Sequence, residues 1–178
     1  MAEPAITEFA RTEPRINIHW KAFELRPHPV PTLDPNGDYL TSAWQEHVYP
    51  LAEKMGFTMH KPPVQPRTRL AHAFAKWAAD NGKFNEFNNA LFKAFFQAGR
   101  DIGNIEILVQ TAEELGMDVN AFEYESQMDS YVQQVLQDEK MARQINVRAV
   151  PAYVVNDKVI AAGVQSLSQL QHLIALNQ

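Results

Sequence analysis

The side chains best suited to catalysis are absent or scattered in this chain. It contains no cysteine, which excludes disulfides, thiolate metal ligands and a cysteine nucleophile from these 178 residues. Its six histidines show no HxxxH-type spacing, which would bring two imidazoles onto one face of a helix. They are His19, His28, His47, His60, His72 and His172. We therefore predict no metal site and interpret each histidine as a surface or core residue.

The charged clusters suggest structural roles. Glu113 and Glu114, and the run QDEK over residues 137–140, fit solvated helix faces that supply charge pairs. Arg100 and Asp101 lie between two glycines at the end of a predicted helix, where a salt bridge or a loop clamp would explain both. The alternative is that Arg100 faces a substrate. We predict no catalytic residue and no cofactor, and we leave open whether the chain is an enzyme.

The best candidate for a binding site is the pair Val150 and Pro151. Apolar runs follow them over residues 153–155 and 158–161, and Asn156-Asp157 between the runs favours a tight turn, so we expect a β-hairpin. Ser166 then starts a helix over residues 167–174. Pro151 therefore opens the hairpin, either as an ordinary first residue of a strand or as a proline of special geometry.

A first strand is predicted well before the hairpin. In residues 16–25, INIHWKAFEL, the apolar residues Ile16, Ile18 and Trp20 alternate with polar ones. Trp20 and Phe23 are weak candidates for the border of a groove, and we favour core packing for both. Proline-rich stretches over 26–37 and 62–66 predict rigid connectors.

The middle of the chain predicts a bundle of short helices. Capping residues place helix starts at Ser42, at Asn104, at Asp118 (through Phe122) and at Ser130. Pro50 should kink or end the first of these helices. Apolar residues at helical spacing over 70–77 and 84–96 predict two more, and we assign the aromatic stripe from Phe84 to Phe96 to the core rather than to a substrate groove.

Charge and hydropathy narrow the class of partner. The net charge is -5 and the basic residues are spread along the chain, so no nucleic-acid footprint is present and nucleic acid is not an expected partner. No apolar run approaches the roughly 18 residues of a membrane span, and none fits a signal peptide. We expect a cytoplasmic protein that does not bind membranes.

Several stretches together resemble one family. They are HWKAFELRP from His19, RLAHAFAKWAADNGKFNEFNNALFKAFFQAGRDIGN from Arg69, TAEELGMD from Thr111 and VRAVPAYVVNDKVIAAGVQS from Val147. In these stretches the chain resembles DsbA-like thioredoxin-fold proteins of the FrnE type, a group that is also similar to 2-hydroxychromene-2-carboxylate isomerases. The resemblance implies an α/β thioredoxin-like fold with an inserted all-helical domain. It also implies a cis Val150-Pro151 bond, with the backbone before Pro151 open to an extended substrate.

The chain departs from that family at its amino end. Family members begin with a strand, a CxxC motif or a serine in its place, and the helix that carries it. We therefore expect a fold that is incomplete there, with the first strand and most of the first helix missing. The remaining strands could close up, pair with a second copy or accept a separate segment, and we favour a homodimer.

These expectations combine into one hypothesis. Residues 1–37 and 147–178 form the thioredoxin-like core, and residues 38–146 form the helical insertion. The family activity is thiol-disulfide oxidoreduction, but without cysteine we expect a redox-inactive chain that binds an extended peptide or protein at Val150 and Pro151. The alternative is a glutathione-dependent isomerase or transferase that uses an external thiol.

Overall fold

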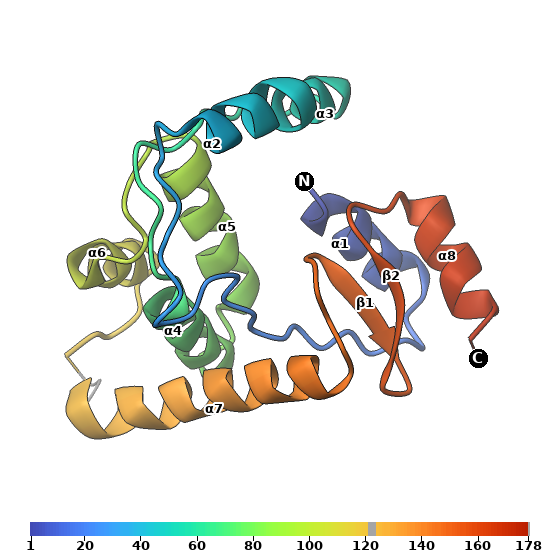
Figure 1. Ribbon diagram of the computed structural model, residues 1–178. Coiled ribbons are helices and arrows are strands. Elements are labelled where there is room, and N and C mark those ends of the chain that lie inside the picture. Colours follow the sequence, from blue (N-terminus) through green and yellow to red (C-terminus); the bar gives the residue numbers. More distant parts are fainter. Residues whose placement is uncertain (121–123, 178) are drawn as a thin grey trace. The chain divides into compact units, whose positions relative to one another are not determined.

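The structure, a computed structural model, describes residues 1–120 and 124–177, and it describes side chains for 1–120 and 128–177 (Figure 1). Contacts along the chain divide it into two compact units. The first consists of Met1–Leu25 together with Gln137–Gln178, and the second consists of Arg26–Leu136. The first unit is thus built from the two ends of the chain, and the second from the segment between them.

The first unit packs two helices and a hairpin around a small apolar core. Helix α1 spans Glu3–Thr12, strands β1 and β2 span Ala152–Val155 and Lys158–Ala162, and helix α8 spans Leu167–Ala175. Ile6, Phe9 and Leu170 are buried at the centre of this core. The partly buried residues packed against them are Ala2, Ala5, Ile16, Ile18, Tyr153, Leu167 and Ile174. Apolar side chains from both chain ends therefore hold the first unit together.

The hairpin agrees with the sequence prediction. β1 and β2 pair antiparallel, with Tyr153 opposite Ala161 and an irregularity in the register between Tyr153 and Val154. Asn156 and Asp157 form the turn with φ angles of 50° and 59°. Two consecutive left-handed residues are what a type I′ turn requires, and Asn and Asp tolerate that conformation better than most residues.

Two of the predicted helix starts are confirmed by their caps. The Ser166 side chain accepts the N–H of Gln169, whose own side chain accepts the N–H of Ser166, so α8 begins with a complete capping box. Asn104 Oδ1 accepts the N–H of Glu106 at 2.9 Å at the start of α6. These polar residues satisfy backbone groups that the first helical turn leaves without partners.

Residues 16–25 do not form the predicted strand. They form no regular element and belong to no sheet, since the described part of the chain contains only the β1–β2 pairing. A strand needs a neighbour to complete its hydrogen-bond ladder, and alternation of apolar residues does not supply one. Ile16 and Ile18 do pack on the core of the first unit. Trp20 is 41% exposed, so its predicted core packing is wrong.

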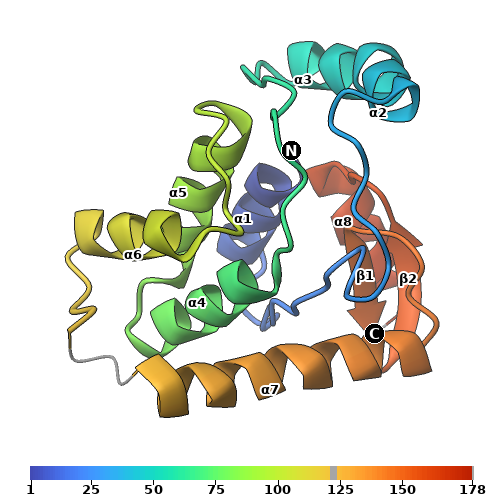
Figure 2. The same ribbon diagram turned by 60° about the vertical axis from the view of Figure 1, so that its left-hand side comes forward.

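The second unit is helical. Its elements are α2 (Asp38–Ala43), the π-helix η1 (Trp44–Val48), α3 (Tyr49–Lys54), α4 (Arg69–Asp80), α5 (Phe84–Phe96), α6 (Ile105–Glu114) and the first part of α7 (Tyr124–Gln144). Helices α4, α5 and α6 pack on one another (Figure 2). Phe74, Phe87 and Leu108 are fully buried in this unit, as expected for a helical bundle with amphipathic members.

Other predicted helix starts are wrong. Helix α7 begins at Tyr124, so Ser130 lies inside it rather than at its cap. The helix predicted from Asp118 through Phe122 falls partly outside the described residues, and residues 118–120 are not helical. Across the described ranges, no helix is both long enough and apolar enough to cross a membrane.

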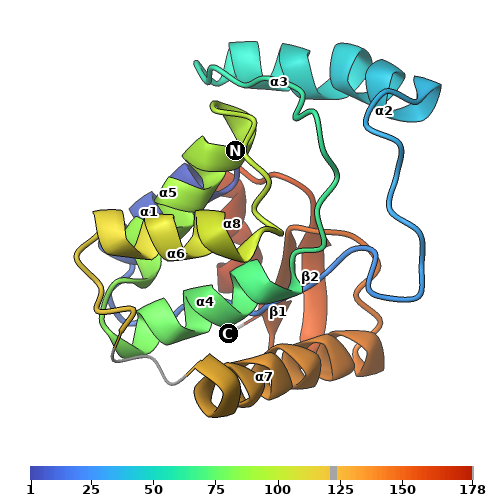
Figure 3. The same cartoon turned by 90° about the vertical axis from the view of Figure 1, so that its left-hand side faces the viewer.

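Helices α2, η1 and α3 follow one another as one helical stretch (Figure 3). The stretch begins at Asp38, with Gly37 as its N-cap, rather than at the predicted Ser42. Pro50 lies in the first turn of α3 and has no N–H to donate to the carbonyl of Glu46. The wider π-helical turn immediately before it accommodates that missing bond, so the proline changes the helix type instead of ending the helix.

The aromatic stripe of α5 is only partly core. Phe87 and Leu91 are buried, whereas Phe92 is 48% exposed. Phe92 stacks on Phe96 with ring centroids 6.3 Å apart, and Phe96 lies 6.1 Å from Trp44. Successive residues of a helix differ in direction by about 100°, so a run of aromatics this dense covers more than one face. The predicted core position is therefore right for Phe87 and wrong for Phe92.

The connector over residues 26–37 is tied to the second unit by side-chain bonds to backbone carbonyls. Lys61 Nζ donates to the carbonyl of Pro35 at 2.9 Å and to Thr41 Oγ1 at 3.2 Å. The guanidinium of Arg67 donates to the carbonyl of Arg26. A proline-rich segment has few N–H groups of its own to bond, so these lysine and arginine donors fix its position through its carbonyls.

Candidate functional site

The candidate site lies where the chain leaves α7 and enters β1. Helix α7 ends in a Schellman motif: the N–H of Val147 donates to the carbonyl of Ala142 at 2.8 Å, and the N–H of Asn146 donates to that of Arg143 at 3.1 Å. Asn146 has a φ of 63°, the left-handed conformation that this motif requires at its turning residue. The cap stops the helix sharply, and the next three residues run free of it.

Those three residues, Arg148, Ala149 and Val150, present their backbone to solvent. All three are exposed, with Val150 at 40%, and no hydrogen bond within the described parts of the chain involves their N–H or C=O groups. The Val150-Pro151 bond is cis, as is His28-Pro29. The carbonyl of Pro151 accepts the N–H of Gly163 at 2.8 Å. The hairpin thus uses the carbonyl of Pro151 but leaves the backbone groups before it open.

Tyr153 fixes this open segment to the first unit. It lies on β1, two residues after Pro151, and packs against the core formed by Ile6, Phe9 and Leu170. Its hydroxyl is buried, and this burial raises the pKa of the Tyr153 phenol. Because β1 is held from behind by this side chain, the backbone just before it has a fixed support.

A free run of backbone beside a supported strand can bind an extended chain. Exposed N–H and C=O groups can pair with the backbone of a guest, as an added β-strand does at a sheet edge. Such pairing requires no catalytic side chain. The free backbone includes Val150, next to Pro151, and extends two residues further, to Arg148.

The Arg100-Asp101 pair serves the fold of the second unit. Asp101 Oδ1 accepts the N–H of Gly103 at 2.8 Å, and the carbonyl of Asp101 accepts the N–H of Asn104 at 3.1 Å. A Cβ at Gly103 would lie 3.0 Å from the carbonyl oxygen of Arg67, so this glycine allows the loop to approach residue 67. Asp101 is the predicted loop clamp. Arg100 is exposed and belongs to the other unit from Val150.

The acidic run over 137–140 departs from its prediction. Asp138 and Glu139 are buried, at 6% and 2% exposure, instead of facing solvent. Asp138 accepts the N–H of Ala22 at 3.1 Å and pairs with Lys21 Nζ at 3.1 Å. Their spacing gave a signal that was missed, since Asp138 and Glu139 fall three and four residues after the fully buried Val135, on the same face of α7.

The acidic pair at the end of α6 lies on the surface. Glu113 and Glu114 are exposed, as predicted, and Glu114 accepts a hydrogen bond from Gln110 at 3.0 Å. Among the residues with described positions, no group of three or more His, Asp or Glu side chains is placed to hold a metal ion.

Comparison with known proteins shows which family this fold and sequence match. The family model described as "DSBA-like thioredoxin domain" matches residues 1–175. Protein YwbO of Bacillus subtilis (strain 168), an uncharacterized protein, is 38% identical over 154 residues, which cover 83% of this chain and 77% of YwbO. Among solved structures, a putative protein disulfide isomerase from Nitrosomonas europaea is similar with a TM-score of 0.72, covering 97% of this chain and 87% of that one at 16% identity.

The three matches agree with the predicted fold. At 16% identity the structural likeness supports the fold alone, and the match over residues 1–175 includes both units. The thioredoxin-like architecture with a helical insertion, predicted from the sequence, is confirmed. The chain belongs to the family of DSBA-like thioredoxin domains.

Proposed function

We propose that this chain binds an extended segment of a peptide or protein along the backbone of Arg148, Ala149 and Val150, next to Pro151. The observation that carries the proposal is that these three residues are exposed and that their backbone groups make no hydrogen bond to any described residue. A guest strand would satisfy those groups in place of water. Pro151 would end the docking segment, because the hairpin already uses its carbonyl.

The proposal assigns binding rather than thiol exchange to these residues. In thiol-disulfide exchange the nucleophile is a thiolate, and these 178 residues contain no cysteine to supply one. Binding of the substrate backbone, in contrast, depends on main-chain groups that are present. The matches to DSBA-like domains and to a disulfide isomerase-like fold do not favour the glutathione-dependent alternative.

Backbone docking can be tested without altering the protein. Unstructured octapeptides would be titrated into isotopically labelled protein while its amide resonances are followed by NMR. We expect shifts at Arg148, Ala149 and Val150, and none at the exposed residues Glu113 and Glu114 of α6. The matched control is the same peptide N-methylated at alternate residues, which removes backbone donors and should weaken binding by about tenfold.

Two results would overturn the proposal. In one, the amides of residues 148–150 do not respond to any of the octapeptides. In the other, the methylated peptide binds as well as its parent, which would mean that side chains and not backbone pairing hold the guest.

A further inference from the structure

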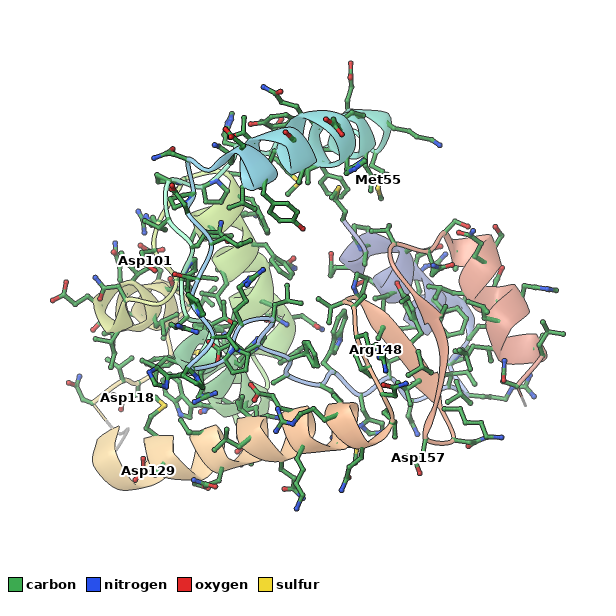
Figure 4. The ribbon with its side chains drawn as sticks, in the orientation of Figure 1. Met55, Asp101, Asp118, Asp129, Arg148 and Asp157 are labelled. Carbon is green, nitrogen blue, oxygen red and sulfur yellow. The ribbon has the colours of Figure 1, made fainter. Side chains whose placement is uncertain are left out.

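We infer that Arg148 gives this docking site a preference for acidic peptides. The inference rests on the proposed function and deepens it, because it names the class of guest. Arg148 is the first residue of the free backbone segment, two residues before Val150, and its side chain is exposed (Figure 4). Consecutive Cα atoms lie about 3.8 Å apart, so the Cα of Arg148 is at most about 7 Å from that of Val150. A guest paired with Val150 therefore extends past Arg148.

The side chain of Arg148 is held in place by the helix cap. Its Nε donates to Asn146 Oδ1 at 2.9 Å. Asn146 is itself fixed as the left-handed turning residue of the Schellman motif. The Nε–H bond thus orients the guanidinium. Its two terminal amino groups make no contact with another polar group of the described chain. A planar group with two free amino ends matches the two oxygens of a carboxylate.

The absence of an acidic neighbour distinguishes Arg148 from three other basic residues of the first unit. Arg11 pairs with Glu8, Lys21 with Asp138, and Arg143 with Glu139. Arg148 has no carboxylate within ion-pair distance in the described ranges. Acidic residues outnumber basic ones in this chain, with 21 Asp and Glu against 16 Lys and Arg. An oriented arginine without an acidic partner, next to an open backbone, is therefore complementary to a carboxylate that a guest supplies.

The overall charge of the protein opposes the binding of acidic peptides. With a net charge of -5 the protein as a whole repels an acidic peptide. A preference for acidic guests must then come from a local positive group, and at this site that group is Arg148. The preference should fall as salt is added, because an exposed ion pair is screened over about 10 Å at 0.1 M salt.

The test compares two fluorescent octapeptides that differ only in four alternate residues, which are Glu in one and Gln in the other. Alternate placement brings an acidic side chain opposite Arg148 in every register that pairs a Glu with Val150. Anisotropy titration of the unaltered protein should give an affinity about two- to fivefold higher for the Glu peptide at low salt. Arg148→Gln should bind both peptides equally. Its only side-chain partner is Asn146, so we expect the variant to fold normally.

The matched control is Arg15→Gln. Arg15 is another exposed arginine of the first unit and is not part of the docking segment, so its loss changes the net charge by the same amount. This variant should keep the preference. If Arg148→Gln also keeps it, if Arg15→Gln loses it too, or if the unaltered protein binds both peptides equally, the role of Arg148 is refuted while backbone docking stands. If neither peptide binds the unaltered protein, backbone docking itself fails, and the inference fails with it.

Discussion

At the scale of single residues, Tyr131 makes a bond whose strength depends on pH. Its hydroxyl donates to Asp80 Oδ2 at 2.8 Å, joining α7 to the last residue of α4. Desolvation and the neighbouring carboxylate raise the pKa of Tyr131 to about 12, compared with about 10 in an unfolded chain. The folded state thus holds this proton more tightly. The contribution of this bond to the free energy of unfolding should be fully present below about pH 10. It should fall as the pH rises toward about 12.

Urea unfolding at a series of pH values from about 8 to about 12 would measure this effect. Tyr131→Phe should lower the free energy of unfolding at neutral pH by up to about 1 kcal/mol, because one hydrogen bond is lost at a half-buried position. The variant should also show a shallower fall above pH 10. Some slope should remain, since burial also raises the pKa of Tyr153. An unchanged slope in the variant would show that Tyr131 is not the group responsible.

The sequence suggested part of the proposed docking site at this scale. Val150 and Pro151 could be found because a proline before a hairpin marks a definite place in the fold. Arg148 was missed, since its importance depends on where Asn146 Oδ1 lies and on the absence of an acid nearby. Asp138 was misjudged for a similar reason. Charged residues are usually exposed. Only the three-dimensional structure shows that Asp138 is buried next to the N–H of Ala22 and the ammonium group of Lys21.

At the scale of elements, Asp138 joins α7 to the segment over residues 16–25 that follows α1. Its carboxylate accepts the N–H of Ala22 and pairs with Lys21. Asp138→Ala should therefore lower the free energy of unfolding by about 2 kcal/mol, since a buried backbone N–H loses its acceptor. Asp138→Asn keeps an acceptor oxygen and should lose less. The matched control Glu113→Ala removes an exposed carboxylate and should change stability by under about 0.5 kcal/mol.

Denaturant unfolding of the three variants provides the comparison. Equal stability of Asp138→Ala and Glu113→Ala would mean that the segment over residues 16–25 is held by its apolar contacts alone. In that case Ile16 and Ile18, which pack on the core of the first unit, would account for its position.

Elements governed by local chemistry were the ones that the sequence predicted well. The turn at Asn156 and Asp157 and the caps at Asn104 and Ser166 follow from residues within a few positions of one another. The strand over 16–25 was wrong because pairing depends on a distant partner. The effect of Pro50 also depended on context, since the π-helical turn before it is one of several ways in which a helix can accommodate a proline.

At the scale of the whole molecule, the order of elements and the family stretches were enough to predict the fold. The thioredoxin-like class with a helical insertion could be inferred because the hairpin and final helix come after a long helical segment. The partners could not be inferred in the same way, since association depends on surfaces rather than on element order. Location in the cytoplasm stays a prediction.

We also propose that two copies of the chain associate through the hairpin sheet. This sheet has two strands in the described chain, so each strand has a free edge, and Val154 and Val159 are exposed on it. Sedimentation equilibrium at micromolar concentration should then give twice the 20.2 kDa mass of one chain. Val154→Lys should shift the equilibrium toward the single chain, because a charge at a strand edge opposes pairing. A mass of 20.2 kDa for the unaltered protein would contradict the proposal.

Helix α7 has a practical consequence for anyone who wishes to express the two units separately. The boundary between them falls between Leu136 and Gln137, in the interior of a helix that runs without interruption from Tyr124 to Gln144. Cutting there would remove about four consecutive backbone hydrogen bonds and leave two new helix ends without intrahelical partners. The Schellman cap at Asn146 would then terminate a piece of only two turns, too short to be stable by itself in water. Any excised fragment that is meant to retain the docking segment should therefore carry α7 entire.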